Sequence, residues 1–163
     1  MRWQLLAVGR LKAGPERELV ERYRTRSDAL GRSSGFGVLD IVELPESRAR
    51  SAPERAAAEG SALLARAEDS RLVVFDERAR SLSSADFAGR LRSWRDDGAS
   101  ISFVIGGPDG LDEAVRRRAD LLVSFGQLTL PHQIVRVLVA EQIYRALTIL
   151  AGHPYHRGEP GGE

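Results

Sequence analysis

Cysteine is absent from this chain of 163 residues. Its absence excludes disulfide bonds, zinc sites built on thiolates, and catalytic thiols. Long apolar runs are absent as well, since no stretch approaches the roughly 20 residues that a membrane-spanning helix needs. No charged and then apolar signal segment precedes Trp3. We therefore expect a cytoplasmic protein with neither a membrane nor a metal partner.

Lysine and net charge are also scarce. The chain has 24 basic and 23 acidic residues, a formal net charge of +1, and Lys12 is its only lysine. So small a net charge gives no general argument for a nucleic-acid partner. The abundant arginine has two explanations, the base composition of the genome or the fit of guanidinium groups to phosphate. The arginines at 22, 24 and 26 and at 116–118 fall in expected helices, where such runs more often form a solvated face.

Strands and helices are expected to alternate along the chain. Apolar runs predict strands at 3–8, 38–44, 71–76 and 101–105, and a broken fifth strand at 121–125 with 128–130. Caps, propensity and apolar spacing predict helices at 15–30, 53–68, 84–98, 112–120 and 131–150, with Gly31 ending the first. This alternation indicates an α/β fold, a mainly parallel sheet with helices on both faces, in a single domain over 1–163.

The last expected helix, after Pro131, is apolar around most of its circumference. A helix that covers a sheet from one side needs an apolar stripe of only about 100°. We therefore expect the second side to be covered by another copy of the chain in a homodimer. Arg136 stands among these apolar residues, so its guanidinium should reach an acid, a backbone carbonyl or a phosphate.

Three loops follow expected strands and are candidates for ligand binding. One is the glycine-rich turn Gly106–Gly110, which fits neither the dinucleotide pattern nor a Walker loop. It is either a simple turn or a bare stretch of backbone against which a ligand rests. The others are Phe75-Asp76 and the run 125–130. In a parallel sheet all three lie at the carboxyl edge, where such sheets bind ligands, and their composition suits a flat, mostly neutral group.

The tail His153-Pro154-Tyr155-His156-Arg157 combines two histidines with an aromatic ring. A metal pair is disfavoured because Pro154 prevents a regular helix and no cysteine or paired acid is near. Two explanations remain open. The tail is a frayed terminus, or Tyr155 stacks on a base while Arg157 holds a phosphate.

Four stretches together resemble the bacterial ribosomal large-subunit methyltransferase H family, of the SPOUT class. They are LLAVGRLK, FVIGGPDGL, SFGQLTLPHQIVRVLVAEQIYRA and HPYHR. The resemblance covers the full length. It implies a C-terminal trefoil knot with the cofactor-binding region at about 71–157, a homodimer, and S-adenosylmethionine as cofactor. The implied reaction methylates N3 of a pseudouridine in 23S rRNA. Relatives usually carry a Gly-Lys pair after the third strand, where this chain has Glu77-Arg78-Ala79-Arg80.

The resemblance places cofactor contacts on loops already singled out. With the bare backbone of Gly107 added, the candidate cofactor-binding residues are Phe75, Gly106, Gly107, Phe125, Gly126, Gln127, Leu128, Thr129 and Leu130. Because the imide N3 must lose a proton, His156 is the first candidate base, with Asp109 and Glu141 as weaker ones. The candidate catalytic residues are therefore His156, Arg136 and Tyr155, and the candidate RNA-binding residues are Arg157 and His132.

The expected substrate is 23S rRNA within an assembled ribosomal particle, because a short and nearly neutral chain has little surface with which to select free RNA. Two alternatives are open. The enzyme methylates another rRNA or tRNA nucleotide, or the chain is a non-catalytic RNA-binding assembly factor.

Overall fold

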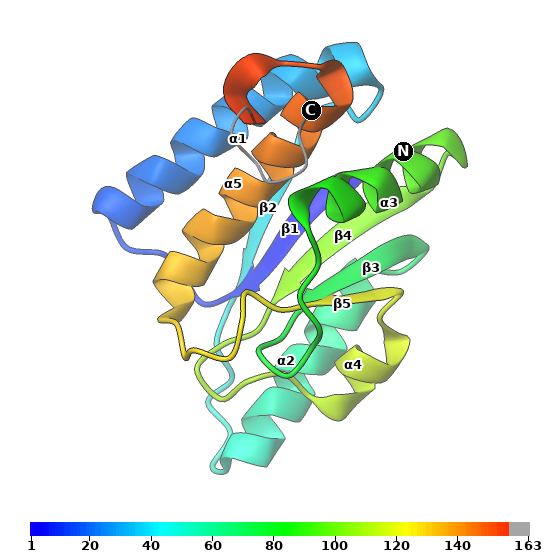
Figure 1. Ribbon diagram of the computed structural model, residues 1–163. Helices are drawn as coiled ribbons and strands as arrows, with labels where there is room; N and C mark the ends of the chain where they lie inside the picture. The colour runs from blue at the N-terminus through cyan, green and yellow to red at the C-terminus, as the bar shows by residue number, and fades with distance from the viewer. Residues whose placement is uncertain (157–163) are drawn as a thin grey trace.

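A five-stranded parallel sheet forms the centre of the molecule (Figure 1). The computed structural model describes residues 1–156, the last of these by its backbone alone. The strands are β1 (Trp3–Val8), β2 (Asp40–Leu44), β3 (Ser70–Phe75), β4 (Ser100–Ile105) and β5 (Leu121–Val123). Their spatial order is β2-β1-β4-β3-β5, and every neighbouring pair is parallel. The predicted fold class and the predicted alternation are confirmed.

Helices cover both faces of this sheet (Figure 1). One face carries α1 (Pro15–Ser34), α3 (Ser84–Asp96) and α5 (His132–Ala151), and the other carries α2 (Ala52–Arg66) and α4 (Glu113–Arg118). A 3-10 turn, η1 (Pro154–His156), follows α5. Strand β1 shows why two layers form. Trp3, Leu5 and Ala7 enter the core beneath α3 and α5, and the alternating Leu6 and Val8 enter the core beneath α2 and α4.

Helix α1 continues past Gly31, so the predicted end at residue 30 is wrong. A side chain at Gly31 would overlap the carbonyl oxygen of Gly37, because the segment after the helix folds back over it. This glycine is required for close packing and not as a terminator. The helix ends at Gly35, whose φ of 81° provides the left-handed cap.

The fifth strand is shorter than predicted and ends at Val123. Ser124 Oγ accepts from the amide of Gly126 at 3.0 Å and donates to the carbonyl of the same residue at 2.9 Å. With Gly126 at a φ of 112°, the chain turns out of the sheet, and 128–130 form no strand. Leu128 is consequently 81% exposed.

Helix α5 lies between α1 and α3 over the middle of the sheet (Figure 1). Val139, Ile143 and Leu147 are buried in the sheet core, and the ring of Tyr144 lies 6.0 Å from that of Tyr23 on α1. The premise that only one side of this helix is covered within the chain is therefore wrong. Ile134 remains 38% exposed, and the homodimer stays a prediction. Within residues 1–156, no helix combines the length and the apolar character needed to cross a membrane.

Candidate functional site

The three predicted loops meet at the carboxyl edge of the neighbouring strands β4, β3 and β5. They enclose a cavity of about 420 Å³. Its walls are the end of β3, the turn after β4 and the segment from β5 to the start of α5. The predicted cofactor-binding residues that line it are Phe75, Gly106, Gly107, Phe125, Gly126, Leu128, Thr129 and Leu130, together with the predicted RNA-binding residue His132. Gln127 is exposed and does not line the cavity.

A flat aromatic surface forms one side of the cavity. The rings of Phe75 and Phe125 are nearly parallel, with 5.5 Å between centroids and 7° between planes. Phe75 is buried, whereas Phe125 is 36% exposed and leaves part of its ring available at the cavity. Such a surface suits a planar, apolar group.

The glycine-rich turn forms a second wall of bare backbone. A side-chain carbon at Gly106 would lie 2.8 Å from Cγ of Leu111, and one at Gly107 would lie 3.0 Å from Cγ1 of Val8. The amide of Gly110 donates to the carbonyl of Gly107 at 3.0 Å and closes the turn. A larger residue at either position would have to displace these neighbouring side chains. With glycine there, a ligand at this wall would meet main-chain atoms.

A buried acid at the cavity is paired with an arginine. The carboxylate of Asp76 is 7% exposed, forms an ion pair with Arg116 and accepts from the amide of Arg78 at 3.1 Å. Sequence reasoning placed Arg116 with its neighbours on a solvated face. Its side chain is only 18% exposed, and the residue lines the cavity. The signal that could have identified it is the acid at the end of β3, which needs a cationic partner once it is buried.

Arg136 is buried next to the carboxyl end of β1, outside the lining of the cavity. Its guanidinium donates to the carbonyls of Val8, at 3.0 Å, and Gly9, and pairs with Glu43. The expectation that it reaches an acid or a carbonyl is confirmed. Burial raises the pKa of the Glu43 carboxyl, but hydrogen bonds from the amide of Leu11 and from Arg136 outweigh it and leave this pKa below its ordinary value.

The tail folds back on α5. The hydroxyl of Tyr155 donates to Glu141 Oε1 at 3.1 Å, its ring lies 4.7 Å from that of Tyr144, and the guanidinium of Arg145 lies 5.1 Å from its centroid. Burial, with Tyr23 and Glu141 close by, raises the pKa of Tyr155. Tyr155 does not line the cavity. The side chain of His156 and all of Arg157 lie outside the described residues.

The weaker base candidates have partners of their own. Asp109 accepts two hydrogen bonds from Arg55, at 2.8 and 3.1 Å, and these lower its pKa. Glu141 accepts from Arg145 at 2.8 Å as well as from Tyr155. The structure thus brings together His132 and all the predicted cofactor-binding residues except Gln127, but not Arg136, Tyr155 or these two acids.

Known proteins that are similar to this chain in sequence are methyltransferases. The family model described as "Predicted SPOUT methyltransferase" matches residues 1–156. The chain is 60% identical over 162 residues to "Ribosomal RNA large subunit methyltransferase H" of Methylobacterium nodulans, covering 98% of this chain and 100% of the relative. A protein with the same name from a Bradyrhizobium species is 59% identical over 159 residues, covering 96% and 98%.

Solved structures agree on the fold. A probable methyltransferase from Bordetella pertussis Tohama I aligns with a TM-score of 0.52 at 17% identity, covering 90% of this chain and 94% of that one. A putative methylase family protein from Neisseria gonorrhoeae aligns with a TM-score of 0.50 at 13% identity, covering 88% and 82%. At these identities the likeness concerns the fold alone.

Proposed function

Because the chain belongs to the SPOUT methyltransferase family, we propose that it uses S-adenosylmethionine to methylate RNA of the large ribosomal subunit. The observation that carries the proposal is the cavity at the carboxyl edge, whose walls are the three loops that the sequence motifs single out. The relatives' printed name specifies large-subunit rRNA. The finer assignment, N3 of a pseudouridine in 23S rRNA, rests on the resemblance of the four motifs.

The residues of the cavity fit this cofactor. The exposed part of the Phe125 ring, stacked on Phe75, offers a flat apolar face for an adenine. The backbone of Gly106 and Gly107, which has no room for side chains, lets polar edges of a nucleoside approach main-chain groups. Bound there, S-adenosylmethionine supplies an electrophilic methyl group for an in-line displacement.

The chain's own contribution is largely positioning, which is where such a displacement gains most. Arg136 holds the end of β1 through Val8 and Gly9, so its proposed catalytic role is to position this edge. His132 lies at the cavity on the first turn of α5 and is proposed to contact RNA. We keep His156 as the proposed acceptor of the N3 proton, with Tyr155 and Arg157 holding the base and a phosphate.

A homodimer completes this proposal. Tyr155 is held against the middle of its own α5 and lies outside the lining of its own cavity. A second copy of the chain would bring the tail of one protomer to the cavity of the other. The proposed enzyme is a cytoplasmic homodimer with the knot at about 71–157, and its proposed substrate is an assembled ribosomal particle.

Two measurements test the function. Calorimetry with S-adenosylmethionine should show saturable binding, whereas a non-catalytic assembly factor should show none. The methylated nucleotide is then mapped in ribosomes from a strain that lacks this protein, before and after the purified protein and cofactor are added. We expect one new methyl group, on N3 of a pseudouridine in 23S rRNA. Methylation of a different nucleotide would support the alternative enzyme, and no methylation would contradict both.

A further inference from the structure

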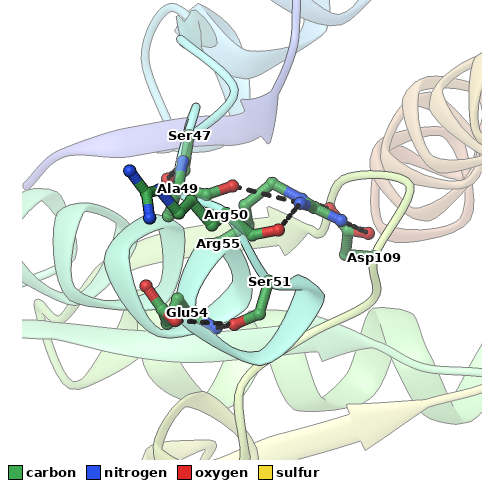
Figure 2. Close-up of polar contacts among 7 residues, drawn as sticks. All are labelled: Ser47, Ala49, Arg50, Ser51, Glu54, Arg55 and Asp109. Carbon is green, nitrogen blue, oxygen red and sulfur yellow. Dashed lines mark hydrogen bonds and ion pairs between the residues drawn. The ribbon is translucent and has the colours of Figure 1, made fainter.

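The segment between β2 and α2 is an exposed loop with a fixed backbone. We define it as the 46–51 loop, Glu46 to Ser51. Ser47 Oγ accepts from the amide of Ala49 at 3.2 Å, and Arg55 Nη1 donates to the carbonyls of Ala49 at 3.1 Å and Arg50 at 3.4 Å (Figure 2). Ser51 accepts from the amide of Glu54 at 3.2 Å and caps α2. The loop is therefore held in one conformation without a strand or helix of its own.

The same contacts tie this loop to the wall of the cofactor cavity. Arg55 donates hydrogen bonds from Nε and Nη2 to Asp109 of the glycine-rich turn. Its Nη1 donates to the backbone of the loop (Figure 2). One helical turn later, the backbone of Ser47 lies close enough to the carboxyl of Glu59 to oppose the rise in its pKa. A side-chain carbon at Gly107 would lie 3.4 Å from Oε2 of Glu59. Arg55 thus links the loop to the cavity wall, and Glu59 lies close to Gly107 of that wall.

Two arginine side chains of the loop are left for another partner. Arg48 and Arg50 are exposed, and among the described residues neither guanidinium has an ion-pair partner. The guanidinium of Arg50 lies on the side of the loop away from Asp109 (Figure 2). A side-chain carbon at Gly9 would lie 2.9 Å from Oε1 of Glu46, so the first residue of the loop lies close to the end of β1.

This arrangement is suited to phosphate. One guanidinium group can bind two phosphate oxygens at once. A backbone that is already ordered loses little conformational entropy on binding. Cations needed only for solubility would require no such anchoring. The loop lies on the carboxyl side of the sheet, as the cavity does, because it follows the end of β2.

We propose that the 46–51 loop is a phosphate-binding arm, whose Arg48 and Arg50 contact the RNA backbone beside the nucleotide that enters the cavity. The proposal rests on the proposed function and adds to it the surface that receives the RNA. Arg55 acts as the positioning residue that sets this arm against the cofactor turn.

The test is a double variant, Arg48→Gln with Arg50→Gln, assayed on ribosomal particles that lack the modification. We expect kcat/KM for the particle to fall about tenfold or more, since two charge-assisted phosphate contacts are lost. The dependence of log kcat/KM on log potassium chloride should become shallower by about one to two. The dissociation constant for S-adenosylmethionine should stay unchanged, because neither side chain lines the cavity.

The matched control is Arg66→Gln with Arg92→Gln, which removes two exposed arginines at the far end of α2 and on α3. It should leave both kcat/KM and its salt dependence as in the unaltered protein. Wild-type kcat/KM and salt dependence in the loop variant would overturn the proposal, as would a loss of cofactor affinity of the same size as the loss of kcat/KM. Failure of the unaltered protein to methylate particles would instead overturn the proposed function.

Discussion

At the scale of single residues, the cavity depends on a few positions whose chemistry is specific. Phe125 is the clearest, because its ring is stacked on the buried Phe75 and is still 36% exposed. An apolar ring left in water beside a cavity is favourable for binding, since a ligand that covers it removes that surface from solvent.

Replacing Phe125 with alanine should weaken the binding of S-adenosylmethionine about tenfold, which corresponds to the roughly 1.4 kcal/mol that one aromatic contact provides. Calorimetry gives the dissociation constant. The control is Leu122→Ala, because Leu122 is 37% exposed, lies on the adjoining β5 and does not line the cavity. Equal losses for the two variants would show that Phe125 has no special contact with the cofactor.

At the scale of elements, α2 does more than cover the sheet. A side-chain carbon at Gly60 would lie 2.9 Å from Cβ of Asp112, so this glycine lets α2 approach the start of α4. The preceding Glu59 is 6% exposed, and its Oε2 has no hydrogen-bond partner among the described residues. Leaving a buried polar group unpaired costs about 1–3 kcal/mol, so the Glu59 carboxylate lowers the stability of the fold.

The pH dependence of folding should report on Glu59. Burial, and then the nearby carboxylates of Asp109 and Glu46, raise its pKa above the ordinary 4.5, although Ser47 and Arg55 oppose this. As pH rises from 4.5 through the raised pKa, the unfolded chain releases this proton first, so the free energy of unfolding falls. Below this pH range the carboxyl is protonated in both the folded and the unfolded chain, so no charge has to be buried.

Glu59→Gln should therefore gain stability relative to the unaltered protein as the pH rises from 4.5 through the raised pKa of Glu59. Glutamine has nearly the shape of glutamate but carries no titratable charge. Urea unfolding at several pH values gives the difference, and Glu68→Gln, at an exposed carboxylate, is the control. A difference between the Glu59 variant and the unaltered protein that does not change with pH would contradict the assignment.

At the scale of the whole molecule, α5 connects the cavity to the expected partner copy. Its first turn lines the cavity, its middle packs between α1 and α3, and its C-terminal half holds Tyr155. Because much of its apolar surface is buried within the chain, the apolar circumference alone no longer argues for a dimer. Two features still favour a dimer: Ile134 is exposed, and Tyr155 lies outside its own cavity.

Sedimentation at micromolar concentration should give twice the 17.9 kDa mass of the chain. Ile134→Glu should shift the protein toward the monomer, because dimer formation would bury the new carboxylate in an apolar interface away from water. Val38→Glu is a matched control, since Val38 is 42% exposed and precedes the edge strand β2. A monomer in the unaltered protein would contradict the homodimer.

The sequence by itself determined the alternation of strands and helices and the three loops of the cavity. These features follow from local periodicity and turn chemistry, and parallel strands necessarily bring their carboxyl ends to one edge. It also predicted that Arg136 needs a partner, though not which one.

Only the tertiary structure decided the contacts between distant segments. Arg136 meets Glu43 and Val8, Arg116 meets Asp76, and Arg55 joins the 46–51 loop to Asp109. A glycine stands at position 31, inside α1, because the chain that folds back over the helix leaves no room for a side chain there. Local patterns do not encode such pairings, because each is settled by which surfaces the packed sheet and helices bring within hydrogen-bonding or van der Waals distance.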